Sequence, residues 1–379
     1  CKSIADGITY QPRPGYEAAK LFAKPDLTLY IRRFLIKHQD NDDINAFLLN
    51  MVWIGQLTGV LTETMALAIN PSKIWIVRII AFKGIKVIGS IKDNEVLRQR
   101  FLSEGPGLNR DLLAELIADI EPTIKTIDWI NSCLELSADE KVNSMDNLID
   151  SLNRLVDIID TELLLRLVLG LNRLLFLPPF IESRNCKVSK KFQSLIEPAS
   201  KAVKRLIISR NPIALEENIL SILIIIPAIR DYGSRILQDR EVDFSEIVSE
   251  WEKLNRALFW YDVQRSRKTI KEKTGKRLSE FWQVSIFEPI WRFEISDFEY
   301  ITNEISHQKL QDDKLVALTL AIYIYRKAKQ PGGWSENLKI LVSDNDELSR
   351  RLDTYLNRSV KSQESDRWKK QEVALNKKR

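Results

Sequence analysis

An all-α protein is predicted, because apolar residues recur at spacings of three and four along nearly the whole chain and because residues that form tight turns are few. The recurring apolar residues run from about Leu27 to Leu356, and such spacing places them on one face of a helix. The 379 residues include only 13 glycines and 13 prolines, whereas a β-sandwich or barrel needs many tight turns. Short connections favour antiparallel neighbours. The sequence therefore predicts an α-solenoid of antiparallel helices with a more globular, aromatic-rich C-terminal end.

Residues that favour the position just before a helix divide the chain into the expected helices. Side chains of Asp, Asn, Ser and Thr accept hydrogen bonds from unpaired first-turn amides. The expected starts lie at Asp26, Asp42 or Asp43, Thr62, the Pro71-Ser72 pair, Asn94, Asn109, Ser137 and Ser296. Ser137 and Ser296 each precede a glutamate by three residues, as in a capping box. Several of these starts are about 30 to 45 residues apart, which is the period of two-helix repeats.

The second half of the chain has a less regular pattern of apolar residues and helix starts. An apolar face over residues 187–209 predicts a helix that Pro198 breaks, kinks or restarts. Further helices are expected over 315–326, 334–342 and 346–356. Four segments are therefore predicted: an irregular leader (1–25), helical repeats (26–180), a C-terminal helical region (181–357) and a basic, frayed tail (358–379). We expect the leader to continue from an upstream module, because Cys1 is not an initiator residue.

Charge is concentrated in short segments, although the chain as a whole carries only +5. Residues 184–210 hold eight basic residues and one acidic residue, a net +7. Residues 265–277 hold seven basic residues and one acidic residue, a net +6. Such segments form solvated helix faces or attract phosphate, so a nucleic-acid-binding helical module is the alternative function. The residues that would contact phosphate are Lys190, Lys191, Lys201, Lys204 and Arg205.

Aromatic residues are dense between residues 251 and 300. Trp282, Trp291 and Arg292 are the candidate partner-binding residues, since Trp and Arg dominate binding hot spots. The competing and favoured interpretation is an aromatic core that seats the last helices. We therefore expect a Trp291 replacement to destabilise the fold more than it weakens binding to any partner.

No catalytic, cofactor or metal site is predicted within this chain. The glycine-rich phosphate-binding loop and the dinucleotide fingerprint are absent. The two histidines, His38 and His307, form no metal-spaced pair. Cys1, Cys133 and Cys186 fit neither a zinc site nor a disulfide framework, which favours a reducing cytoplasm. The most apolar run, residues 220–229, is too short to span a membrane, so no membrane partner is expected.

Several segments resemble a known family. Residues 70–81 (Asn-Pro-Ser-Lys-Ile-Trp-Ile-Val-Arg-Ile-Ile-Ala) and 109–116 (Asn-Arg-Asp-Leu-Leu-Ala-Glu-Leu) resemble the HEAT-like helical regions of bacterial STAND or NACHT-type NTPases. Residues 291–294 (Trp-Arg-Phe-Glu) and 312–318 (Asp-Asp-Lys-Leu-Val-Ala-Leu) resemble the C-terminal ends of such proteins. The resemblance implies HEAT-like repeats and a sensor or scaffold arm in a signalling or anti-phage defence protein. It also implies a protein partner, with any NTPase module lying upstream.

Overall fold

The computed structural model describes residues 14–137, 147–183, 186–230, 244–284 and 290–356. Helix makes up 76% of these residues, which confirms the all-α prediction. The chain divides into two compact units, Cys1–Glu241 and Val242–Arg379. This division lies later in the chain than the boundary at 180/181 that composition suggested.

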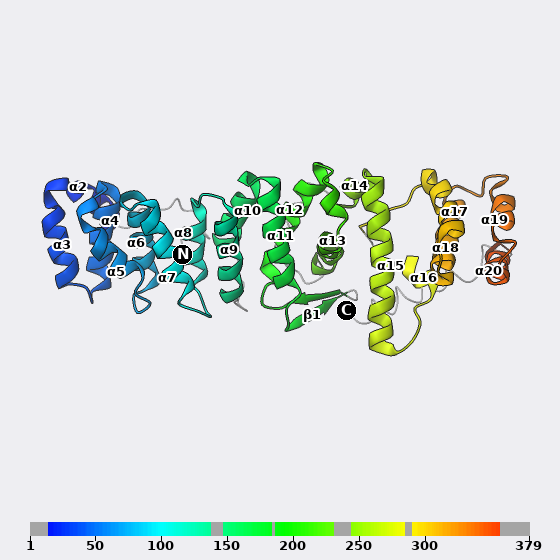
Figure 1. Cartoon of the computed structure of the whole chain (residues 1–379), viewed down its shortest axis with the longest axis horizontal. Helices are drawn as coiled ribbons and strands as arrows, with labels where there is room; N and C mark the ends of the chain where they lie inside the picture. Colours follow the sequence, from blue (N-terminus) through cyan, green and yellow to red (C-terminus); the bar gives the residue numbers. More distant parts are fainter. Residues whose placement is uncertain (1–13, 138–146, 184–185, 231–243, 285–289, 357–379) are drawn as a thin grey trace. The chain divides into compact units, whose positions relative to one another are not determined.

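Unit 1 contains helices α2 to α13 and a β-hairpin (Figure 1). Its first six helices are α2 (Pro14–Phe22), α3 (Thr28–Lys37), α4 (Asp42–Gly55), α5 (Leu61–Ala68), α6 (Trp75–Ile88) and α7 (Ile91–Leu102). The next six are α8 (Arg110–Ala118), α9 (Ile124–Leu136), α10 (Asn147–Ile158), α11 (Thr161–Leu175), α12 (Ile196–Ile208) and α13 (Glu217–Arg230). The hairpin strands β1 (Phe180–Ser183) and β2 (Cys186–Ser189) are antiparallel.

Side-chain caps fix several helix starts in unit 1. Asn109 accepts a hydrogen bond from the Leu112 amide at 3.0 Å, as predicted. The start expected at Asn94 is wrong, because Ser90 and Asp93 form a reciprocal capping box one turn earlier. Thr62 caps nothing, since α5 already begins at Leu61. These caps satisfy first-turn amides that have no partner within the helix.

The remaining expected starts near the two ends of the chain also shift. Asn41 caps α4 in place of Asp42 or Asp43, and Asp26 lies in a short 3-10 turn before α3. Glu294 and Asp297 form the capping box that was expected at Ser296. The capping box expected from Ser137 reaches into residues outside the described ranges; Ser137 itself closes α9.

The helices of unit 1 contact one another in an alternating order. The even-numbered helices from α2 to α12 pack each against the next even-numbered helix. The odd-numbered helices α7, α9, α11 and α13 pack in the same way on one another, and α3 contacts α5. Figure 1 shows these helices following one another through unit 1 in chain order. Helices two apart in the sequence are therefore direct neighbours.

Polar cross-links show that neighbours two apart run parallel. Arg166 of α11 donates to Asp128 of α9 near their starts, with Nη2 to Oδ2 at 2.6 Å. Arg173 of α11 and Glu135 of α9 meet near their ends at 2.7 Å. In the other series, Asn147 at the start of α10 donates to Asp111 at the start of α8 at 2.9 Å. Start meets start and end meets end, so these helices two apart in the sequence run parallel.

Gly170 of α11 occupies a close approach to α9. A Cβ atom at this position would overlap the side-chain amide of Asn131, which donates to the Arg166 carbonyl at 3.3 Å. We expect Gly170→Ala alone to gain nothing, because Asn131 must move away. In an Asn131→Ala background the same change should stabilise unit 1 by about 0.5–1 kcal/mol, the usual advantage of alanine inside a helix. Urea titrations of the four proteins check this, and equal effects in both backgrounds would contradict the overlap.

Two further expectations for unit 1 are corrected. The leader is not irregular throughout, because residues 14–22 form α2, whose Tyr16 ring lies 6.0 Å from that of Trp53 in α4. The helix expected over residues 187–209 is shorter, because the chain forms β2 and a 3-10 turn before α12 begins at Ile196. Pro198 lies in the first turn of α12, where its missing amide leaves no hydrogen bond unmade.

Unit 2 contains the remaining helices. They are α14 (Phe244–Ser249), α15 (Glu252–Thr274), α16 (Glu280–Val284), α17 (Phe298–His307), α18 (Gln311–Lys327), α19 (Trp334–Val342) and α20 (Asp346–Leu356). Most residues of α18 are buried, and α16, α17 and α20 all pack on this helix. The helix α18 is therefore the centre of the core of unit 2.

Candidate functional site

One edge of unit 1 brings together several helix ends. Short connections place the C-terminal ends of α6, α8 and α10 beside the N-terminal ends of α7, α9 and α11. Parallel stacking of helices two apart brings these ends, and the C-terminal end of α12, to one side. A cross-link from Lys86 in the last turn of α6 to Asp119, just after α8, places two of these ends side by side at 3.2 Å. We call this side the turn edge.

Large apolar side chains are exposed along the turn edge. Each lies at the first, last or penultimate position of its helix: Val87, Ile91, Ile124, Ile158 and Ile208. Ile91 and Ile158 are 79% and 69% exposed. Among the helices that carry these side chains, α7 packs on α9 and α10 packs on α12, and packed helices are about 8–10 Å apart. Contiguous exposed apolar patches on a protein surface mark interaction sites.

The polar groups of the turn edge are held in fixed positions. Asp93 accepts from the backbone amide and the hydroxyl of Ser90 at 2.8 and 2.6 Å, and these hydrogen bonds lower the pKa of its carboxyl. Lys86 bridges Glu115 and Asp119 at 3.1 and 3.2 Å. The turn edge therefore presents exposed aliphatic groups between fixed charges.

Two of the predicted phosphate-contacting residues, Lys201 and Arg205, lie near this edge and bind groups of α10 and the residue after it. Lys201 donates to the Asn153 carbonyl at 3.0 Å and pairs with Asp157 at 2.6 Å. Arg205 donates to the Val156 carbonyl and, at 3.1 Å, to the Ile159 carbonyl. The Val156 carbonyl lies in the last turn of α10 and the Ile159 carbonyl just after it, so neither has a partner within the helix. Both side chains therefore join α12 to α10.

The other three predicted phosphate-contacting residues lie elsewhere on the same segment. Lys190 follows β2 and is exposed, and its amide donates to the Pro179 carbonyl at 2.7 Å. Lys191 and Lys204 are half-buried. The second basic segment, 265–277, belongs to unit 2.

The aromatic segment of unit 2 places Trp291 in the core. Trp291 is 4% exposed, and its ring meets that of Phe259 edge to face at 5.0 Å. Its indole Nε1 donates to Asp262 Oδ2 at 3.0 Å. The Phe259 ring also meets Trp260 and Phe293 edge to face at 4.9 and 5.1 Å. An aromatic core of this kind is what the favoured interpretation of the sequence expected.

The two other candidate partner-binding residues lie at the surface. Trp282 is 38% exposed and packs edge to face on Phe281 at 5.6 Å. Arg292 is exposed, while its backbone is held by Asn255, which both accepts from the amide at 2.9 Å and donates to the carbonyl at 2.6 Å. The structure therefore separates Trp291 from the exposed side chains beside it in the sequence.

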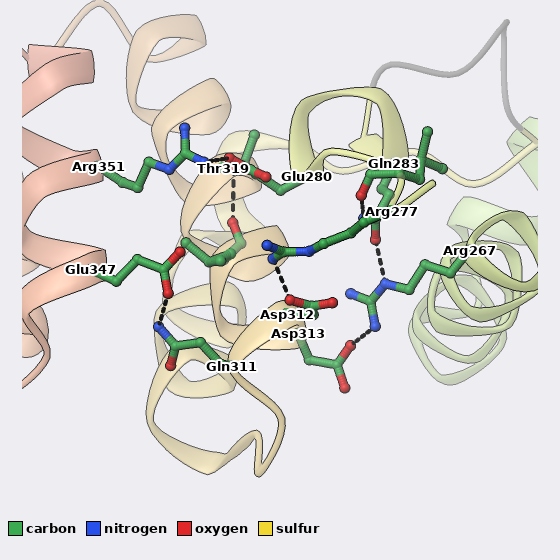
Figure 2. Close-up of polar contacts among 12 residues, drawn as sticks. Arg267, Arg277, Glu280, Gln283, Gln311, Asp312, Asp313, Thr319, Glu347 and Arg351 are labelled. Carbon is green, nitrogen blue, oxygen red and sulfur yellow. Dashed lines mark hydrogen bonds and ion pairs between the residues drawn. The ribbon is translucent and has the colours of Figure 1, made fainter. Parts of the chain in front are cut away.

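A polar network joins α15, α16, α18 and α20, and Figure 2 shows its members. Arg267 of α15 pairs with the buried Asp313 of α18, and its Nε donates to Gln283 Oε1 at 2.6 Å. The buried Glu280 of α16 pairs with Arg351 of α20 at 3.1 Å. Each buried carboxylate thus faces a guanidinium, as in a structural ion-pair network.

The thiol and histidine side chains of the described part take local roles. Cys133 is buried in α9, and this burial raises the pKa of its thiol, as expected for a core cysteine. His307 closes α17 through a 2.7 Å contact from Nδ1 to the Asn303 carbonyl. Within the described ranges, no group of three or more His, Cys, Asp or Glu side chains is placed to hold a metal. No helix in the same ranges is both long and apolar enough to cross a bilayer.

Sequence reasoning missed the turn edge. A single isoleucine at the first or last position of a helix carries no signal by itself. Its partners lie on helices two apart, and only the parallel stacking brings them to one side. No protein-family model, curated protein or solved structure matches this chain.

Proposed function

We propose that this chain is a HEAT-like α-solenoid that recognises a protein partner through the turn edge of unit 1. The observation that supports the proposal most directly is the recurrence of exposed apolar side chains at Val87, Ile91, Ile124, Ile158 and Ile208. Stacked helix pairs give extended surfaces on which a partner is bound across several repeats. A partner segment laid along this edge would contact one or two aliphatic groups at each helix pair.

The repeat character is supported by the sequence separation of the cross-links. Arg166 and Asp128 are 38 residues apart, and so are Arg173 and Glu135. Trp129 Nε1 donates to the carbonyl of Arg98, 31 residues earlier. These separations fall in the range of two-helix repeats, which is the range that the spacing of the predicted starts suggested.

The wider role that we propose is that of a sensor or scaffold arm in a larger bacterial NTPase-type protein of signalling or anti-phage defence, in the cytoplasm. This part of the proposal rests on the resemblance of residues 70–81, 109–116, 291–294 and 312–318 to STAND or NACHT-type proteins. An arm of stacked helices that binds a partner suits such a role, with the nucleotide-binding module of the same protein lying upstream.

Site-specific photo-crosslinking in the native cell tests the recognition proposal. A photoreactive phenylalanine at Ile158 should give one discrete adduct with a protein. Serine at Ile91 and Ile124 should reduce the yield of that adduct, because both side chains belong to the same surface. The control places the photoreactive group at Ile340 of α19, which is exposed but lies in unit 2. Equal adducts from both positions, or a yield that ignores Ile91 and Ile124, would count against the turn edge.

Calorimetry with ATP and magnesium addresses the assignment of nucleotide binding to an upstream module. The chain lacks the glycine-rich loop and its lysine, so we expect no saturable heat at micromolar ATP. Saturable micromolar binding would move the nucleotide site into this chain.

A second candidate function, nucleic-acid binding, is favoured by the C-terminal half of α15. Lys268 and Lys271 of this helix, and Lys276 just after it, are exposed. Arg267 and Arg277 of the same basic segment are paired with Asp313 and Asp312. The two basic segments lie in different units. Lys201 and Arg205 of the first segment already bind carbonyl groups of α10 and the residue after it.

We therefore expect weak nucleic-acid binding that falls steeply with salt. Fluorescence anisotropy with a labelled duplex measures it. Reversal of Lys268, Lys271 and Lys276 to glutamate should lower the slope of log affinity against log salt by about one per lysine. Reversal of Lys190, Lys191 and Lys204 is the matched control. Tight binding at physiological salt that this control abolishes would instead support the nucleic-acid function of residues 184–210.

A further inference from the structure

The helix α3, at one end of unit 1 in Figure 1, has apolar side chains on two opposite faces. Ile31 and Leu35 are buried against the rest of the unit. The opposite side exposes Leu29, Tyr30, Arg33, Phe34, Ile36 and Lys37. At 100° per residue these six side chains share one side of the helix, which we call the outer face of α3. Leu29 is 68% exposed.

The outer face is where the stacking of unit 1 would continue. The helix α9 has neighbours on both sides, α7 and α11. The helix α3 packs on α4, α5 and two short turns, all of which, except the turn just before it, follow it in the chain. A helix that is apolar on opposite faces is normally covered on both. The geometry of the outer face therefore suits another helix, packed as α5 is packed on the inner side.

The charged side chains of the outer face indicate which kind of helix could pack on it. Arg33 and Lys37 lie among the exposed apolar groups, one helical turn apart, and the outer face holds no acidic side chain. A second copy packed face to face would bring these cations against their own counterparts. The outer face therefore does not complement itself, and a face-to-face pair of copies is disfavoured.

We propose that the outer face of α3 binds an amphipathic helix of a partner protein whose apolar stripe is flanked by acidic side chains. The stripe packs on Leu29, Phe34 and Ile36, and the carboxylates pair with Arg33 and Lys37. This surface is distinct from the turn edge, so either proposal can fail without the other. The outer face continues a series in which helices pack on helices. We therefore favour a helix over an anionic lipid surface as its partner.

Binding of a synthetic helical peptide to the full chain tests the proposal. The probe has a leucine stripe flanked by glutamates, and the control peptide has lysines in their place. Fluorescence anisotropy should show saturable micromolar binding of the glutamate peptide only. Leu29→Ser and Phe34→Ser should each weaken it about ten-fold or more, the loss typical of a central apolar contact. Ile340→Ser, which removes an equally exposed aliphatic group from unit 2, should leave it unchanged.

A charge exchange gives the sharper result. The variant carrying Arg33→Glu and Lys37→Glu should bind the lysine peptide in preference to the glutamate peptide. All replaced side chains are exposed, and circular dichroism of each variant verifies that the helices are intact. Absent binding, or a preference that the exchange does not reverse, overturns the proposal. So does dimerisation in sedimentation, or binding to anionic vesicles, that Leu29→Ser abolishes, since each identifies another occupant.

Discussion

Replacement of Trp291 by alanine should lower the free energy of unfolding of unit 2 by about 3–5 kcal/mol, as is typical of a buried tryptophan. The indole fills the space beside Phe259 and donates to Asp262, and Asp262 is itself buried. The change therefore leaves a cavity and removes a hydrogen bond from a buried carboxylate. Urea denaturation followed by circular dichroism measures the loss.

Trp282→Ala is the matched control for this experiment. Its side chain is partly exposed and contacts Phe281, so a change within about 0.5–1 kcal/mol is expected. Unfolding of Trp291→Ala at the wild-type urea concentration, together with lost partner binding, would instead make Trp291 a binding residue.

The second large effect is expected at Asp313, for which the neighbouring residue is the control. Asp313 is buried and pairs with Arg267, whereas Asp312 pairs with Arg277 at the surface. Asp313→Ala leaves the guanidinium of Arg267 without its carboxylate in the core, which typically costs about 3–5 kcal/mol. Asp312→Ala should cost about 0–1 kcal/mol, as exposed pairs do.

A compensating variant separates the charge from the packing. In the double variant Arg267→Met, Asp313→Leu, both buried charges are gone and the volume is kept, so most of the stability lost in Asp313→Ala should return. Thermal melts of the four proteins measure this. Equal effects at Asp312 and Asp313 would mean that the buried pair is as well hydrated as the surface pair.

The sequence predicted the helices better than their beginnings. The helix expected to open at the Pro71-Ser72 pair is α6, which begins three residues later, at Trp75, and has a long apolar pattern. The cap expected at Asn94 was wrong, because the helix begins one turn earlier. There the Ser90 side chain accepts from the Asp93 amide, and the Asp93 side chain accepts from the Ser90 amide. Where several capping residues fall within one turn, the pattern alone does not choose among them.

The candidate surfaces were less predictable than the fold. The apolar density around Trp291 indicated a core, and the structure places that tryptophan in one. The pairing of Lys201 and Arg205 with α10 was invisible, because the carbonyls that they satisfy lie about fifty residues away in the sequence and become neighbours only through stacking. The turn edge was missed for the same reason.

Stacking of helices two apart also has a mechanical consequence. Every cross-link described for α9, α10, α11 and α12 ties a helix to its near neighbours, so a small rotation at each interface adds to the next along the unit. Tension applied to the ends of unit 1 would therefore be shared as small displacements at every pair. It would change the spacing between Ile91, Ile124 and Ile158.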